Sequence, residues 1–318
     1  MEFPTSASPH VVAGYTVPRV MFQVLLALTP VLAVQVYLYG PGPLWLVAVA
    51  CVTALACEAL ALAMRRRSSQ AALRDGSVLV TAALLALAVP PLLPWWLLAF
   101  GTAFAVLIGK HAYGGLGQNP FNPAMVGYAV LLVSFPLEMT RWPLPGPEWD
   151  ALTGATALDA LRTGLRQGYT MQEVRAGAEF GRLGAAGSEW VNVAALAGGA
   201  YLLARRIIRW QIPVAMLAGL AVPAALAHGL DPGAHPGALF HLASGATMLG
   251  AFFIATDPVS AATSDRGRLL YGAGIGLVTW IIRSWGGYPD GVAFAVLLMN
   301  LTVPLLDRVT VPRIHGHP

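Results

Sequence analysis

The chain has 318 residues, of which 57% are hydrophobic and 11% are charged. Soluble domains contain roughly 45–50% apolar and about 25% charged residues, so this composition excludes a single soluble core and predicts an all-α, polytopic membrane protein. The net charge of +4 does not indicate a nucleic-acid partner, because the basic residues gather at the ends of apolar runs. Membrane lipid is therefore the expected surrounding of the chain.

Apolar runs of roughly 15–21 residues predict about ten transmembrane helices in one integral membrane domain, residues 1–318. Several runs are short or are interrupted by Pro and Gly, which predicts broken helices. The predicted spans are 20–39, 44–64, 77–93, 95–109, 122–136, 189–204, 211–228, 236–255, 268–282 and 291–306. The first run is too long for the apolar core of a signal peptide, so no cleavable signal is expected.

The distribution of basic residues predicts the orientation of the spans. With both termini in the cytoplasm, the cytoplasmic segments contain 13 of the 19 basic residues. The segment 137–188 holds five of the other six and becomes an outer, periplasmic loop, whereas Arg283 falls in a short outer loop. The 13 are Arg19, Arg65, Arg66, Arg67, Arg74, Lys110, Arg205, Arg206, Arg209, Arg266, Arg268, Arg308 and Arg313.

A weak internal repeat predicts two pseudo-repeated halves. Asn119-Pro-Phe-Asn122-Pro-Ala124 in the first half and Asp257-Pro-Val-Ser260-Ala-Ala262 in the second fit one pattern near the cytoplasmic side. Interrupted apolar segments in matching halves are how transport folds place a polar site inside a membrane. The alternative is helix termination, since Asn or Asp followed by Pro commonly opens a turn.

The outer loop contains a threonine among small residues, Thr156 in the stretch D-A-L-T-G-A-T-A-L (150–158). A hydroxyl exposed there is accessible to a modifying enzyme. The alternative is an ordinary helix N-cap before Leu158. The two interpretations are compatible, because free amides and the macrodipole at a helix N-terminus favour a phosphate group.

Polar residues within apolar runs are functional candidates by default. Glu58 belongs either to an ion pathway or to a packed polar contact. Lys110 and His111 are expected at the membrane interface, where a lysine can extend toward water. Asp290 is expected to form a turn.

No catalytic residue and no metal site are predicted. Cys51 and Cys57 lie six residues apart in one apolar run and cannot pair within a straight helix. The histidines are too scattered for a ligand cluster. No G-x-G-x-x-G opens a strand–helix unit, so NAD is expected to bind elsewhere.

Three long stretches resemble RnfD, a membrane component of Rnf electron-transport complexes that is related to NqrB of the sodium-pumping NADH:quinone oxidoreductase. They are G-K-H-A-Y-G-G-L-G-Q-N-P-F-N-P-A-M-V-G (109–127), A-F-F-I-A-T-D-P-V-S-A-A-T (251–263) and W-G-G-Y-P-D-G-V-A-F-A-V-L-L-M-N (285–300). The resemblance covers nearly the whole chain. Chain length favours the RnfD type, since NqrB usually carries a longer N-terminal extension.

The resemblance implies that FMN is joined to the Thr156 hydroxyl by a phosphoester, attached by a flavin transferase outside the membrane. The motif is Thr153-Gly154-Ala155-Thr156, with Thr153 where the family more often has Ser and Ala157 where it more often has Pro. The resemblance also suggests a second, non-covalent flavin, riboflavin, near the inner face. Its candidate contacts are Asn119, Asn122 and Asp257.

A second copy of the motif, Ser244-Gly245-Ala246-Thr247, is the closer match in letters. In a continuous helix starting near Pro236, Thr247 would lie roughly 17 Å from the outer surface, beyond the reach of a soluble transferase. Thr247 is therefore interpreted as small-residue helix packing.

The resemblance further implies a bacterial inner-membrane protein that is not catalytic alone. Its partners would be the A, B, C, E and G components of an Rnf complex, which couples electron transfer between ferredoxin and NAD⁺ to Na⁺ or H⁺ movement. The alternatives are an NqrB-like component of the sodium-pumping quinone reductase and a stand-alone channel or transporter, which the interrupted spans also fit.

Overall fold

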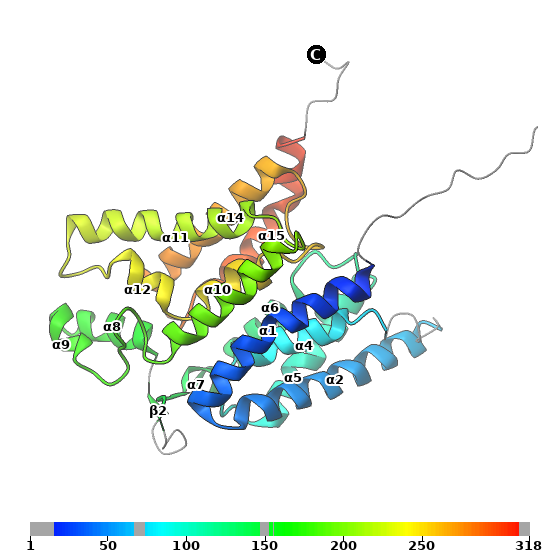
Figure 1. The fold of residues 1–318 in the computed structure, drawn as a ribbon, viewed down its shortest axis with the longest axis horizontal. Coiled ribbons are helices and arrows are strands. Elements are labelled where there is room, and N and C mark those ends of the chain that lie inside the picture. The colour runs from blue at the N-terminus through cyan, green and yellow to red at the C-terminus, as the bar shows by residue number, and fades with distance from the viewer. Residues whose placement is uncertain (1–15, 67–73, 147–152, 155, 312–318) are drawn as a thin grey trace, which may run out of the picture.

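A computed structural model describes residues 16–66, 74–146, 153–154 and 156–311 (Figure 1). Nearly all of the regular structure in these residues is helical, so the expected all-α membrane fold is confirmed. The first half comprises α1 (Val17–Tyr39), α2 (Gly42–Met64), α4 (Ser77–Ala88), α5 (Trp95–Phe104), the π-helix η1 (Ala105–His111) and α6 (Pro123–Ser134).

A polar segment connects this half to the second one. It contains α7 (Pro136–Thr140), the antiparallel pair β1 (Trp142–Pro143) and β2 (Thr153–Gly154), α8 (Ala157–Arg166) and α9 (Met171–Arg175). The second half comprises α10 (Ser188–Ala204), α11 (Gln211–Leu230), α12 (Ala238–Ala243), α13 (Thr247–Leu249), the π-helix η2 (Gly250–Ile254), α14 (Asp265–Trp285) and α15 (Val292–Val309).

Each predicted span coincides with a helix or a series of helices in the described residues. Four of them, α1, α2, α11 and α15, are long and apolar enough to cross a membrane by themselves. The span 236–255 is not one helix, because α12 ends at Ala243 and the backbone is extended at Ser244 before α13 begins. A continuous helix from near Pro236 was expected for this span, so the break at Ser244 differs from that expectation.

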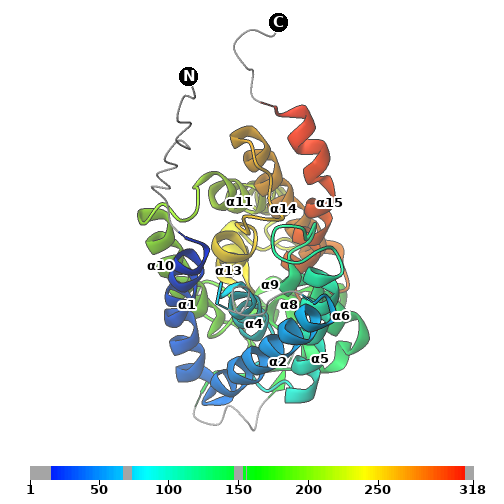
Figure 2. The same ribbon diagram turned by 90° about the vertical axis from the view of Figure 1, so that its right-hand side faces the viewer.

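The two halves meet along paired helices. α1 packs against α10, with the two chains running in opposite directions (Figure 1), and α6 contacts α15. Small residues allow the close approach: a Cβ on Gly198 of α10 would lie 2.2 Å from the carbonyl oxygen of Ala27 in α1. Figure 2 shows α4 and α13 near the middle of the molecule, and their side chains are largely buried.

The molecule has two distinct ends. α7, α8 and α9 lie at one end, which we call the loop end (Figure 1). Val17 of α1 and Val309 of α15 lie at the opposite end, which we call the terminal end. The cavity described below opens beside the polar segment at the loop end.

Candidate functional site

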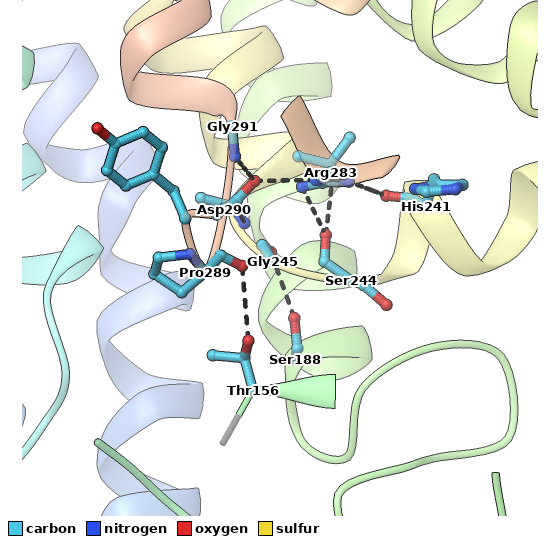
Figure 3. Close-up of polar contacts among 12 residues, drawn as sticks. Thr156, Ser188, His241, Ser244, Gly245, Arg283, Pro289, Asp290 and Gly291 are labelled. Atoms are coloured by element: carbon cyan, nitrogen blue, oxygen red, sulfur yellow. Dashed lines mark hydrogen bonds and ion pairs between the residues drawn. The ribbon is translucent and has the colours of Figure 1, made fainter. Parts of the chain in front are cut away.

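Thr156 stands at the start of α8, where the predicted N-cap is confirmed. Its backbone is extended, and its Oγ1 accepts a hydrogen bond from the Asp159 amide at 3.3 Å. The hydroxyl also lies 3.5 Å from the Pro289 carbonyl oxygen, to which it donates a long hydrogen bond (Figure 3). Arg162 holds α8 in this place by donating to the carbonyl oxygens of Gly286 and Tyr288.

The residues before Thr156 are only partly described. Thr153 and Gly154 form strand β2, which pairs with Pro143 and Trp142 of β1. Ala155 lies outside the described residues. The β1–β2 pair therefore brings the predicted motif next to Trp142, which lines the cavity beside Thr156.

Thr156 lines a cavity between the two halves. The cavity is partly open to solvent. Its walls are mostly apolar and include three aromatic side chains, Tyr39, Tyr128 and Trp142. Away from Thr156, Met125 and Ile254 also line the cavity, so it extends between α6 and η2.

The second copy of the motif forms the break between α12 and α13. Thr247 is fully buried, and its hydroxyl lies 2.8 Å from the carbonyl oxygens of both His241 and Ser244. The expectation of a continuous helix was wrong here, so the depth derived from it does not apply. Burial nevertheless separates the two threonines, since Thr156 is only half-buried.

Arg283 and Asp290 form an ion pair at this break, 2.9 Å from Nε to Oδ1 (Figure 3). The side chain of Arg283 is 0% exposed, whereas an outer-loop position was expected. It lies in α14 and donates to the carbonyl oxygens of His241 at 2.7 Å and Ser244 at 3.2 Å. It also donates to Thr247 Oγ1 at 3.0 Å.

Asp290 does more than form the predicted turn. Its carboxylate accepts from the amides of Gly291 at 2.6 Å and Ala246 at 2.9 Å. Burial acts to raise the pKa of Asp290, but Arg283 and these amide donors outweigh it and lower the pKa below its ordinary value. The two charges also suit the helix ends that they contact. The Asp290 carboxylate contacts the N-terminal end of α13, and the Arg283 guanidinium contacts the C-terminal end of α12.

Gly245 is required by this arrangement. Its φ is +61°, and an added Cβ would lie 2.3 Å from Asp290 Oδ2 and 2.8 Å from Arg283 Nη2. A side chain would displace the ion pair and strain the backbone. At Ser244–Thr247, the glycine of the motif is therefore explained by the geometry of the helix break.

Two of the three residues predicted to contact a second flavin, Asn122 and Asp257, belong to one hydrogen-bonded network, which we call the terminal-end cluster. The Asn122 side chain donates to the Ile254 carbonyl at 3.1 Å, and the Asn122 backbone N–H donates to Asn300 Oδ1 at 3.1 Å. Asn300 donates to the Ser260 carbonyl at 3.0 Å, and the Ser260 hydroxyl donates to Asp257 at 2.6 Å. The structure thus brings Asn122 and Asp257 into one network.

Asn119 stays outside that network and donates to the Phe121 carbonyl of its own turn at 3.0 Å. Asn300 was not among the predicted residues. It is buried, and an asparagine within the apolar run 291–306 could have been recognised from the sequence. Burial raises the pKa of Asp257, while hydrogen bonds from Ser260 and Val259 oppose that effect.

Glu58, Lys110 and His111 form a second buried ionic cluster. Lys110 Nζ lies 3.0 Å from both Glu58 oxygens and from Ser77 Oγ, and His111 Nε2 lies 2.8 Å from Glu58. The predicted interfacial position of Lys110 and His111 is wrong, because their side chains are 3% and 6% exposed. Of the two interpretations of Glu58, the packed polar contact is present.

Comparison with known proteins places the chain in a family. The model of the NQR2, RnfD, RnfE family matches residues 4–316. A Pseudomonas aeruginosa (strain UCBPP-PA14) protein, named as the D subunit of an ion-translocating oxidoreductase complex, is 54% identical over 335 residues, covering 100% of this chain and 97% of the relative. A Vibrio cholerae (strain O395) protein of the same name is 50% identical over 348 residues, with both chains fully covered. On this match the chain belongs to the NQR2, RnfD, RnfE family.

Proposed function

We propose that this chain is the RnfD component of an Rnf-type ion-translocating oxidoreductase complex and that Thr156 carries FMN through a phosphoester bond. The placement of Thr156 supports this most directly. Of the two threonines that end a matching motif, Thr156 is half-buried and lines a cavity, whereas Thr247 is enclosed and engaged with Arg283. Only the first is accessible to an enzyme that transfers a flavin.

The residues around Thr156 fit a phosphate and a flat aromatic ring. The free amides at the N-terminus of α8 and its macrodipole favour the charge of a phosphate. The aromatic and apolar walls of the cavity suit an isoalloxazine ring. When bound, FMN would supply the ability to accept and donate electrons, while the protein supplies its position and surroundings.

The position of the cavity supports a relay through the protein. Thr156 and Ile254 both line it, and the Ile254 carbonyl accepts the hydrogen bond from Asn122 of the terminal-end cluster. The cavity therefore adjoins the cluster that joins the two halves. We propose that electrons pass along this interface between partner proteins, coupled to Na⁺ or H⁺ transport.

A non-covalent riboflavin at the terminal end stays a prediction. Both polar atoms of the Asn122 side chain already have partners. Nδ2 donates to the Ile254 carbonyl, and Oδ1 accepts from the Met125 backbone N–H. The side-chain carbonyl oxygen of Asn119 and one oxygen of Asp257 are therefore the better candidates for such contacts.

The proposal places the chain in the bacterial inner membrane with the terminal end in the cytoplasm and the loop end outside. The A, B, C, E and G components of the complex would be its partners, and a flavin transferase would act at the loop end. Ferredoxin and NAD⁺ chemistry would belong to those partners.

In-gel fluorescence tests the covalent flavin. The chain, co-expressed with a flavin transferase, should give a fluorescent band near 33.4 kDa under ultraviolet light on a denaturing gel. Thr156→Ala should abolish the fluorescence, and Thr247→Ala should retain it at equal protein level. A dark wild-type band, or fluorescence that follows Thr247, would contradict the proposal.

A further inference from the structure

Asp290 contributes a fixed negative charge to the wall of the cavity that Thr156 lines. Glu179 is the other carboxylate among the described residues lining it. The side chain of Asp290 is 15% exposed, whereas that of its partner Arg283 is 0% exposed and lies behind it. Because Asp290 lines the cavity and Arg283 does not, the ion pair presents its negative end to the cavity.

The pair is rigidly held. Asp290 accepts from Arg283 and from the amides of Ala246 and Gly291, and Arg283 is bound by the carbonyl oxygens of His241 and Ser244. Neither side chain can rotate away without leaving buried groups unpaired. A charge held in this way needs no reorganisation when the charge on a neighbouring group changes.

We infer that the Arg283–Asp290 pair tunes the flavin held at Thr156 by lowering its reduction potential. The inference rests on the function proposed above. Reduction adds electrons to the flavin ring, and a negative dipole end close to the ring opposes that added charge. Asp290 thereby keeps the attached flavin a stronger reductant than it would be in a neutral cavity.

The test is a redox titration of the full chain, co-expressed with a flavin transferase and purified in detergent. The flavin absorbance is followed as the potential is changed. Asp290→Asn should shift the midpoint potential to a more positive value. Ser188→Ala is the matched control. Ser188, at the start of α10, donates a hydrogen bond to the Gly245 carbonyl at 3.2 Å and carries no charge, so its loss should leave the potential unchanged.

Glu179→Gln separates a specific effect of Asp290 from the removal of any carboxylate. Glu179 lines the same cavity from the polar segment and, like Asp290, is half-buried. Asp290 differs in being held by Arg283 and by two backbone amides, so its charge keeps a fixed position at the cavity wall. Neutralising Glu179 should therefore shift the potential less than Asp290→Asn, and an equal or larger shift would overturn the assignment to Asp290.

Asp290→Asn leaves Arg283 buried without a counter-ion, which can prevent folding. The double variant Arg283→Gln/Asp290→Asn removes both charges while its side-chain amides can still bond the carbonyl oxygens and amides of the break, and it should also shift the potential positively. An unchanged or more negative potential in either variant would overturn the inference. So would loss of flavin from variants that accumulate normally, because the pair would then act in attachment.

Failure of the inference can be distinguished from failure of the proposed function. A wild-type chain without covalent flavin at Thr156 overturns the proposed function. A wild-type chain with the flavin, whose potential does not respond to the pair, overturns only the role of Asp290.

Discussion

Thr156 and Thr247 end nearly identical motifs, but their oxygen atoms lie in different surroundings. Thr156 Oγ1 is engaged by one backbone amide and one distant carbonyl, and it lines an open cavity. Thr247 Oγ1 lies within hydrogen-bonding distance of two carbonyl oxygens and of Arg283. Reactivity toward a transferase depends on access to that oxygen, so local packing and not the motif alone distinguishes the two.

Charge pairing at Glu58 gives a prediction about stability. Glu58→Gln leaves the ammonium group of Lys110 buried without its counter-ion, and breaking a buried pair in this way costs about 3–5 kcal/mol. We expect a clearly lower unfolding temperature in detergent, measured by a thermal shift. The double variant Glu58→Gln/Lys110→Met should recover most of the loss, and an unchanged single variant would show that the pair contributes no stability.

At the scale of the helices, the break at Ser244–Ala246 creates two helix ends inside the protein. The carbonyl groups that α12 leaves unpaired bind Arg283, and the first amide before α13 binds Asp290. A broken helix needs such partners because water does not reach its ends inside the protein, where Ser244 and Thr247 are buried. The ion pair and the break are therefore one structural feature.

Glycine at position 245 gives a prediction for this feature. Gly245→Ala forces a non-glycine residue to a φ of +61° and places Cβ 2.3 Å from Asp290 Oδ2, so it should cost at least about 1–3 kcal/mol of stability. Gly229→Ala is the control, because α11 has open space there and alanine favours a helix. Thermal unfolding should fall for the first variant and be unchanged or higher for the second; equal values would contradict the role of Gly245.

The sequence predicted the helices well and their mutual contacts poorly. Hydropathy alone located the spans, because each is a local property of about twenty residues. Glu58 and Lys110 stand 52 residues apart, and no local pattern indicates that η1 turns Lys110 toward α2. The Arg283–Asp290 pair was missed because the positive-inside pattern describes topology and not side-chain burial.

At the scale of the whole molecule, the charged residues divide between the two ends. Helix termini with Arg65, Arg205 and Arg308 lie at the terminal end, together with the start of α14 at Asp265. The polar segment with α8 and α9 lies at the other end (Figure 1). This separation is what a single orientation in the membrane requires.

Labelling of single cysteines tests that orientation. In a chain whose Cys51 and Cys57 are replaced by Ala, Arg175→Cys on α9 should react with a membrane-impermeant maleimide in intact spheroplasts. Arg209→Cys, which is exposed at the terminal end, should react only after the membrane is opened. The reverse pattern would invert the proposed orientation, because a membrane-spanning helix fixes both of its ends.

The contact between Thr156 and Pro289 has a consequence for the order of events during maturation. A hydroxyl can donate to the Pro289 carbonyl, but an ester oxygen has no proton and cannot. If Thr156 carries FMN as proposed, this hydrogen bond belongs only to the chain before attachment. Attachment of a flavin would release the carbonyl of the residue next to Asp290, and the backbone at 289–290 would differ between the immature and the mature protein.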